Sequence, residues 1–254
     1  MLQELYIWSL SNAVAGARSA GLVYEVAAIA GRHRRNHDSW QPHLEHVKNI
    51  ISASLCHAEK SKPVLLLGAG LGLDIPFAAL NAHPAGAILV DAVETPQMRA
   101  HIRHNKNLTL ECADITGFLA LFWQSKTGDE LSPPLIAPIL HHDCGLVISC
   151  NILSQLPLCF ANSPPNGDTE IRITDAVQQA HMRALEAFKC PVLLITDYER
   201  IETTEGTKKT VLTVPPHLLP GDANEEWMWD ISPLGEAQDG SRAMLKVGAW
   251  LFGC

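Results

Sequence analysis

The stretch that decides the fold reads Leu65-Leu66-Leu67-Gly68-Ala69-Gly70-Leu71-Gly72-Leu73-Asp74. An apolar run ends in three glycines spaced by two, and a helical pattern follows them. Glycine lets the backbone approach a ligand closely, and the start of the next helix directs N–H groups at it. Leu73 stands where the dinucleotide fingerprint GxGxxG has its last glycine, so the spacing is GxGxG. The stretch therefore predicts a buried strand, a ligand-binding turn and a helix.

The same order of apolar run, turn and helix recurs along the chain. The apolar runs cover residues 64–67, 87–90, 108–112, 146–149 and 191–196, and helical patterns cover 73–81, 95–104 and a segment capped by Thr174. Continuous apolar runs between helices are typical of parallel strands buried on both faces. Two later runs, at 227–231 and 244–251, flank a Pro-Leu-Gly-Glu…Asp-Gly connection, which is typical of an antiparallel hairpin. We expect an α/β protein with a doubly wound sheet.

Composition limits the partners. The chain has 254 residues, 47% of them hydrophobic, and a net charge of −8, which disfavours a nucleic-acid or other polyanion partner. The short basic run at 32–35 is expected to be a solvated helix end. Glu4 and Glu25 interrupt the apolar start, so we expect no signal peptide and no membrane span. Seven cysteines without a CxxC motif indicate reduced thiols of a cytoplasmic protein.

Two carboxylates follow the next two predicted strands. Asp91 ends the second run, where a carboxylate can accept both hydroxyls of a ribose, and Asp114 follows the third run. In a doubly wound sheet the carboxyl ends of neighbouring strands border one crevice. The glycine loop, Asp91 and Asp114 are therefore expected to face one nucleoside ligand.

These motifs, in this order, resemble the class I S-adenosylmethionine-dependent methyltransferases. The resemblance rests on GAGLG, LVDAVETPQMR, LTLECADITG, LVISCNILSQLPL, PVLLITD and the terminal hairpin, and it covers residues 62–251. It implies a seven-stranded, mostly parallel sheet with an antiparallel last strand, residues 61–254 as the cofactor-binding unit and residues 1–60 as a helical cap. It also implies S-adenosyl-L-methionine as the cofactor. The implied cofactor-binding residues are Gly68, Ala69, Gly70, Leu71, Gly72, Asp74, Asp91, Ala92, Asp114, Ile115, Cys150 and Asn151.

Residues on the expected acceptor side follow the fourth and fifth strands. Asn151, Gln155 and Asp197 are the candidate catalytic residues, with His181 or Asp197 as a base if the acceptor is protonated. Asn151-Ile152-Leu153-Ser154 lacks the prolines of the motif found in amino-nitrogen methyltransferases, so the resemblance leaves the acceptor open. We expect a small molecule. An NAD(P)-dependent oxidoreductase and a non-catalytic scaffold of the same fold are the alternatives.

The histidines are expected to be solvated or capping, and the tryptophans to be part of the core. His33 and His37, His43 and His46, and the run at 141–144 have spacings that could share an ion, but none has a second pair at a recognised metal spacing. We therefore expect no metal site. Trp227 and Trp229 alternate with Met228 and should pack one strand face against a helix.

Overall fold

A computed structural model describes residues 2–124, 132–139, 143–160, 167–204, 206–237 and 239–253, without the side chains of residues 167–172. The α-helices are α1 (Leu2–Leu10), α2 (Leu22–Arg35), α3 (His37–Ser54), α4 (Phe77–Ala82), α5 (Pro96–His104), α6 (Leu119–Gln124) and α7 (Gly167–Ala187). The short 3-10 helices are η1 (Leu55–His57), η2 (Leu156–Cys159) and η3 (Pro216–Leu218). The strands are β1 (Asn12–Ala13), β2 (Val64–Leu67), β3 (Ala87–Asp91), β4 (Val93–Glu94), β5 (Leu108–Cys112), β6 (Leu146–Cys150), β7 (Val192–Thr204), β8 (Thr207–Leu212), β9 (Glu225–Ser232) and β10 (Arg242–Phe252).

One mixed sheet organises the fold. Its strand order is β5-β3-β2-β6-β7-β10-β9, and β8 pairs with β7 as well. The strands β5, β3, β2, β6 and β7 are parallel, whereas the last strand, β10, runs antiparallel between β7 and β9. The predicted doubly wound α/β sheet and the late hairpin are confirmed, and β8 adds an eighth strand that the sequence did not predict.

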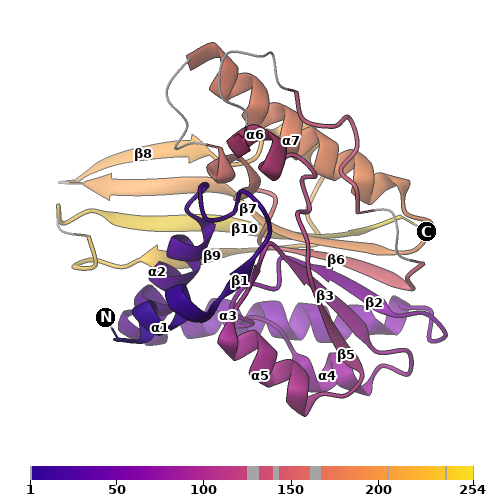
Figure 1. Cartoon of the computed structure of the whole chain (residues 1–254). Helices are drawn as coiled ribbons and strands as arrows, with labels where there is room; N and C mark the ends of the chain where they lie inside the picture. The colour runs from indigo at the N-terminus through magenta and orange to yellow at the C-terminus, as the bar shows by residue number, and fades with distance from the viewer. Residues whose placement is uncertain are drawn as a thin grey trace.

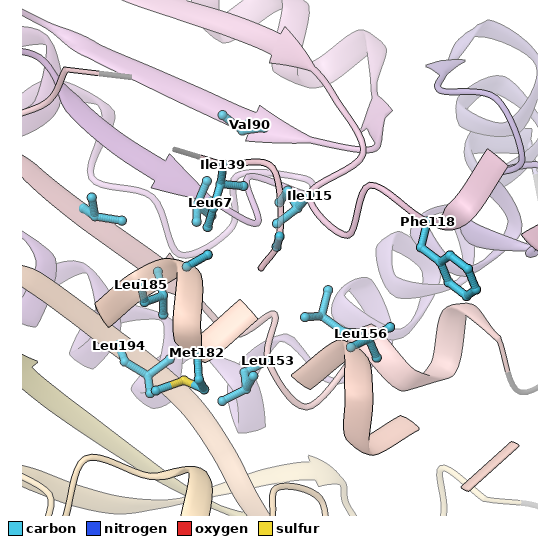
Figure 2. Packing of buried hydrophobic residues seen from close by; sticks show 14 of the residues in the cluster. Leu67, Val90, Ile115, Phe118, Ile139, Leu153, Leu156, Met182, Leu185 and Leu194 are labelled. Atoms are coloured by element: carbon cyan, nitrogen blue, oxygen red, sulfur yellow. The ribbon is translucent and has the colours of Figure 1, made fainter. Parts of the chain in front are cut away.

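Helices cover both faces of the sheet (Figure 1), with α7 and α6 above it and α3, α4 and α5 below it. Alternate residues of each central strand face the two layers. Leu65 and Leu67 pack with α7, while Leu66 packs with Val47 and Ile51 of α3. Figure 2 shows part of the α7-side core, where Leu185 and Met182 lie near Leu194. Apolar burial of this kind on two faces is the main stabilisation of the fold.

Local signals predicted several boundaries well. Thr95 is the N-cap of α5, with its hydroxyl oxygen accepting a hydrogen bond from the Met98 N–H at 3.1 Å, and Pro96 is the first helical residue. Two predicted helix starts are wrong. The helix after the glycine loop begins at Phe77 rather than Leu73, and α7 begins at Gly167, so Thr174 lies inside it.

The fifth strand differs most from its prediction. The apolar run ends at Thr196, but β7 continues to Thr204 because β10 pairs with it on one side and β8 on the other. The sequence predicts that Asp197 follows the fifth strand. This prediction is wrong, because Asp197 lies within β7. Ladder hydrogen bonds to β10 and β8 hold this largely polar extension in place.

The N-terminal segment is helical and lies against the sheet domain. α3 packs on the sheet, and Trp40 at its start donates a hydrogen bond to the Ile231 carbonyl of β9 at 3.1 Å. The two-stranded pair β1–β4 connects residues 12–13 to the segment after β3. In the described part of the chain, no helix is long and apolar enough to cross a membrane. The division of the chain at residue 60 stays a prediction.

Candidate functional site

The glycine loop follows β2 and combines two tight contacts with one open position. All three glycines have positive φ, the left-handed region that favours glycine. A Cβ atom at Gly68 would meet the Cys150 carbonyl oxygen at 2.5 Å, and one at Gly72 would meet the Phe77 ring at 2.6 Å. At Gly70 (φ +48) a Cβ atom would meet nothing within 4 Å. Gly68 and Gly72 are therefore required for packing, while Gly70 faces open space beside the strand ends.

Asp91 ends β3 directly beside that open position. Its Oδ2 accepts a hydrogen bond from the Gly70 N–H at 2.8 Å, and its Oδ1 accepts one from the Val93 N–H at 2.9 Å. Burial raises the pKa of this carboxyl, and the N–H donors oppose the rise. A carboxylate has about four acceptor sites, so Asp91, which also receives the Ala92 N–H, keeps one for a further donor. Ala92, the next residue, accepts the Val14 N–H through its carbonyl and links the loop to the N-terminal segment.

Asp114 has a different role from Asp91. Its Oδ1 accepts hydrogen bonds from the Thr116 N–H at 2.9 Å and the Thr116 hydroxyl at 2.6 Å, and its Oδ2 accepts one from the Leu119 N–H at 2.8 Å. These contacts hold the turn that leads into α6. Asp114 therefore shapes the wall of the site mainly by fixing its own loop.

A cavity opens where β2, β3 and β5 end. It is small, about 30 Å³, and the residues around it are Leu67, Val90, Glu111, Ala113, Asp114, Ile115, Pro138 and Ile139. Figure 2 shows Leu67, Ile115 and Ile139 close together, with Val90 above them in the view. Most of the residues around it are apolar, and the carboxylates of Glu111 and Asp114 lie at its border.

A second polar cluster lies on the other side of the glycine loop. The Asn151 amide donates to Asp74 Oδ2 at 2.8 Å, and the Cys150 thiol approaches the same oxygen at 3.6 Å. Burial raises the pKa of the Asp74 carboxyl and raises that of the Cys150 thiol well above its usual range. Asn151 has φ +50, a left-handed conformation that asparagine tolerates better than most residues. The contact with Asp74 holds the Asn151 side chain beside the glycine loop.

The candidate acceptor-side residues occupy different environments. Gln155 is exposed and donates its amide to the Asn151 carbonyl at 2.7 Å. Asp197 is 7% exposed and accepts a hydrogen bond from the Ser154 hydroxyl at 2.5 Å, and burial raises the pKa of its carboxyl. His181 is fully buried, hydrogen-bonds to Ser149 at 2.9 Å, and has its pKa lowered to about 4 by burial. Of the two candidate bases, Asp197 contacts a residue that follows β6, Ser154, whereas His181 contacts Ser149 within the strand.

The N-terminal helices contact the glycine loop. Leu71 packs against Ile7 of α1 and against Ala27 and Ala30 of α2. The Arg99 guanidinium of α5 donates to the Leu10 carbonyl at the end of α1, at 2.6 Å. A loop residue that the sequence assigned to cofactor binding thus points its side chain at the helical segment.

His43 and His46 of α3 and the two tryptophans of β9 form a packed cluster, so the expectation of a solvated or capping histidine is wrong for His43, which is buried. His43 stacks on Trp229, with ring centroids 3.9 Å apart, and its Nδ1 accepts a hydrogen bond from Trp227 Nε1 at 3.0 Å. This confirms the prediction that both tryptophans pack against a helix. Over the described residues, no group of three or more His, Cys, Asp or Glu side chains is placed to hold a metal ion. His141 and His142 lie outside the described residues.

Sequence reasoning missed part of the site. Pro138 and Ile139 close the cavity over β2, and Ser154 is the hydrogen-bond partner of Asp197. The segment 132–138 had only the signal of a proline-containing loop, and no local pattern relates it to β2. A serine in a turn has many local uses, so Ser154 had no signal of its own.

Comparisons with known proteins found resemblances among solved structures only. No family model and no curated protein matches the chain. A Burkholderia thailandensis 1,6-didemethyltoxoflavin-N1-methyltransferase with bound S-adenosylhomocysteine is similar at 11% identity and TM-score 0.43, covering 94% of this chain and 91% of that one. A glycopeptide N-methyltransferase complexed with S-adenosylhomocysteine is similar at 11% identity and TM-score 0.32, and the match covers 80% of this chain and 89% of that one. A predicted O-methyltransferase from Agrobacterium tumefaciens is similar at 15% identity and TM-score 0.28, and the match covers 78% of each chain. The fold assignment rests on the sheet topology of the chain itself.

Proposed function

We propose that this protein is a methyltransferase that uses S-adenosyl-L-methionine to methylate a small molecule. One observation carries the proposal: Gly70, the one loop glycine with open space around it, lies within hydrogen-bond distance of the strand-end carboxylate of Asp91. A backbone that a ligand can approach, next to a carboxylate with a free acceptor site, suits a ribose.

The residues present fit this cofactor. Leu67, Val90 and Ile115, which lie around the small cavity at the strand ends, would supply apolar contacts to an adenine ring. Asp91 would accept the ribose hydroxyls, and Asp74 and Asp91 together supply negative charge beside the loop for a positively charged ligand. Gly68, Ala69, Leu71, Gly72, Ala92, Asp114, Ile115 and Cys150 would shape or support this site.

When bound, S-adenosyl-L-methionine supplies a methyl group activated by a sulfonium. The chain would then mainly align the acceptor and exclude water, since methyl transfer depends strongly on alignment. Asn151, which Asp74 holds in position, and Gln155, which bonds to the Asn151 backbone, would orient the acceptor. Asp197, with its raised pKa, would take the proton of an acceptor that carries one.

Binding of S-adenosylhomocysteine, measured by isothermal titration calorimetry, tests the proposal. We expect the wild-type protein to bind it and Gly70→Asn to bind at least about tenfold more weakly, because the new side chain fills the open position. Asparagine tolerates positive φ, so backbone strain stays small. The matched control is Gly240→Asn, at another open glycine with φ +70, which should bind within about twofold of wild type.

The other functions give different results in the same experiment. Binding of NADH but not of S-adenosylhomocysteine would identify an oxidoreductase. If the wild-type protein bound neither ligand at millimolar concentration, the result would contradict the enzyme hypothesis and support a non-catalytic scaffold. Equal affinity of Gly70→Asn and wild type for S-adenosylhomocysteine would exclude the glycine loop as the site.

The acceptor needs a separate measurement. Metabolite profiling of a deletion strain should show one compound that accumulates without its methyl group.

We also propose that the protein works in the cytoplasm without a nucleic-acid partner. Six cysteines are thiols and not disulfides, which supports the cytoplasm. The net charge of −8 supports the absence of a nucleic-acid partner.

A further inference from the structure

Two cysteines meet at the end of the sheet opposite the glycine loop. Cys144 lies just before β6 and Cys190 just before β7, and their sulfur atoms are 3.9 Å apart although 46 positions separate them in the chain. Cys144 is buried and Cys190 is partly exposed. The fold alone brings these thiols together, because β6 and β7 are parallel neighbours.

We propose that Cys144 and Cys190 are a redox modification site, which hydrogen peroxide converts into a reversible disulfide.

The positions of the two sulfur atoms allow this bond. β6 and β7 pair with Val147 opposite Val192, so the segments just before the two strands lie side by side. The two Sγ atoms are 3.9 Å apart and a disulfide bond is about 2.05 Å long, so each sulfur needs to move by only about 1 Å to form it.

The chemistry assigns the two sulfurs different roles. The more exposed Cys190, as thiolate, attacks a peroxide oxygen, which breaks the O–O bond and leaves a sulfenic acid and one water. The Cys144 sulfur then displaces the remaining oxygen as a second water and forms the S–S bond. The two thiols together lose two electrons and two protons, and the peroxide is reduced to two waters. Burial, helped by the neighbouring Cys190, raises the pKa of Cys144 to about 12, so Cys144 is the poorer nucleophile towards free peroxide and the first step falls to Cys190.

The consequence is a covalent link between the amino ends of β6 and β7. The cross-link closes a loop that contains β6, η2 and α7, which restricts the unfolded chain. Cys150 and Asn151 lie at the opposite end of β6, so the link should leave the proposed cofactor site unchanged. In a reducing compartment the bond would form only transiently, as redox-sensing disulfides do.

The test uses the whole protein in its folded state. After hydrogen peroxide treatment and alkylation of remaining thiols, peptide mass spectrometry should find Cys144 joined to Cys190, and dithiothreitol should reverse the link. The Tm of the oxidised protein should rise by roughly 5–10 °C. Cys144→Ser and Cys190→Ser should each lose both effects, while their Tm under reducing conditions shows that they fold.

Cys159→Ser is the matched control. This thiol is partly exposed on η2 and contacts the Gln155 carbonyl, away from the pair, so its loss should leave cross-link and Tm gain intact. Three results would overturn the proposal: a cross-link from Cys144 or Cys190 to another thiol, over-oxidation of Cys190 without a cross-link, or a Tm gain that persists in Cys144→Ser.

Discussion

Acid should destabilise this protein through His43, and the size of the effect can be worked out from its surroundings. The side chain is 3% exposed, its ring stacks on Trp229, and its Nδ1 accepts the Trp227 indole N–H. An accepting Nδ1 requires the neutral ring with its proton on Nε2. Burial, and to a smaller extent the charge of His46, lower the pKa of His43 to about 3.

The sign and magnitude follow from linkage. In the unfolded chain the histidine pKa is 6.5, so the unfolded state binds a proton below this pH. In the folded state His43 stays neutral until the pH approaches its own pKa of about 3. The free energy of unfolding therefore falls by about 1.4 kcal/mol for each pH unit below 6.5. Between pH 7.5 and pH 5.0 the loss from this one residue is about 2 kcal/mol.

The assay is urea unfolding of wild type and His43→Gln at both pH values. Glutamine can still accept the Trp227 N–H through its amide oxygen, but it does not titrate. Wild type should lose about 2 kcal/mol more than the variant between the two pH values. Contributions of distant groups such as His181 occur in both proteins and cancel. The same change at His37, whose side chain is 58% exposed, controls for loss of a surface histidine. Equal losses in wild type and His43→Gln would refute the reasoning.

Three further substitutions test other parts of the structure. Leu66→Ala removes a fully buried side chain from the α3-side core and should lower the free energy of unfolding by about 3 kcal/mol in urea titrations. Thr95→Ala removes the N-cap of α5 and should cost about 1 kcal/mol by the same method; no loss would show that the cap bond is not stabilising. Asp197→Asn removes a carboxyl whose pKa is raised by burial, so the variant should gain stability relative to wild type at pH 8 but not at pH 3, and an equal effect at both would contradict the raised pKa.

Local rules predicted the elements whose own residues decide them. Thr95 and Pro96 supply the cap and the first helical residue of α5, and Leu108–Cys112 is a strand with the bounds that its apolar run suggests. The prediction failed where pairing overrides composition. β7 extends through polar residues to Thr204, and β8 forms from a segment that is exposed along its whole length, because each completes the other's hydrogen bonds.

The sequence by itself determined that a glycine turn and two acids stand at successive strand ends of a parallel sheet, because strand and turn signals are local. Only the tertiary structure decided what each polar group contacts. Asp91 accepts a hydrogen bond from the Gly70 N–H, whereas Asp114 accepts hydrogen bonds within its own turn. Asp74 accepts a hydrogen bond from the Asn151 amide. The tertiary structure also brings Cys144 to Cys190, 46 positions away. These partners come from distant segments, and their meeting depends on strand order and helix packing, which no spacing in the sequence encodes.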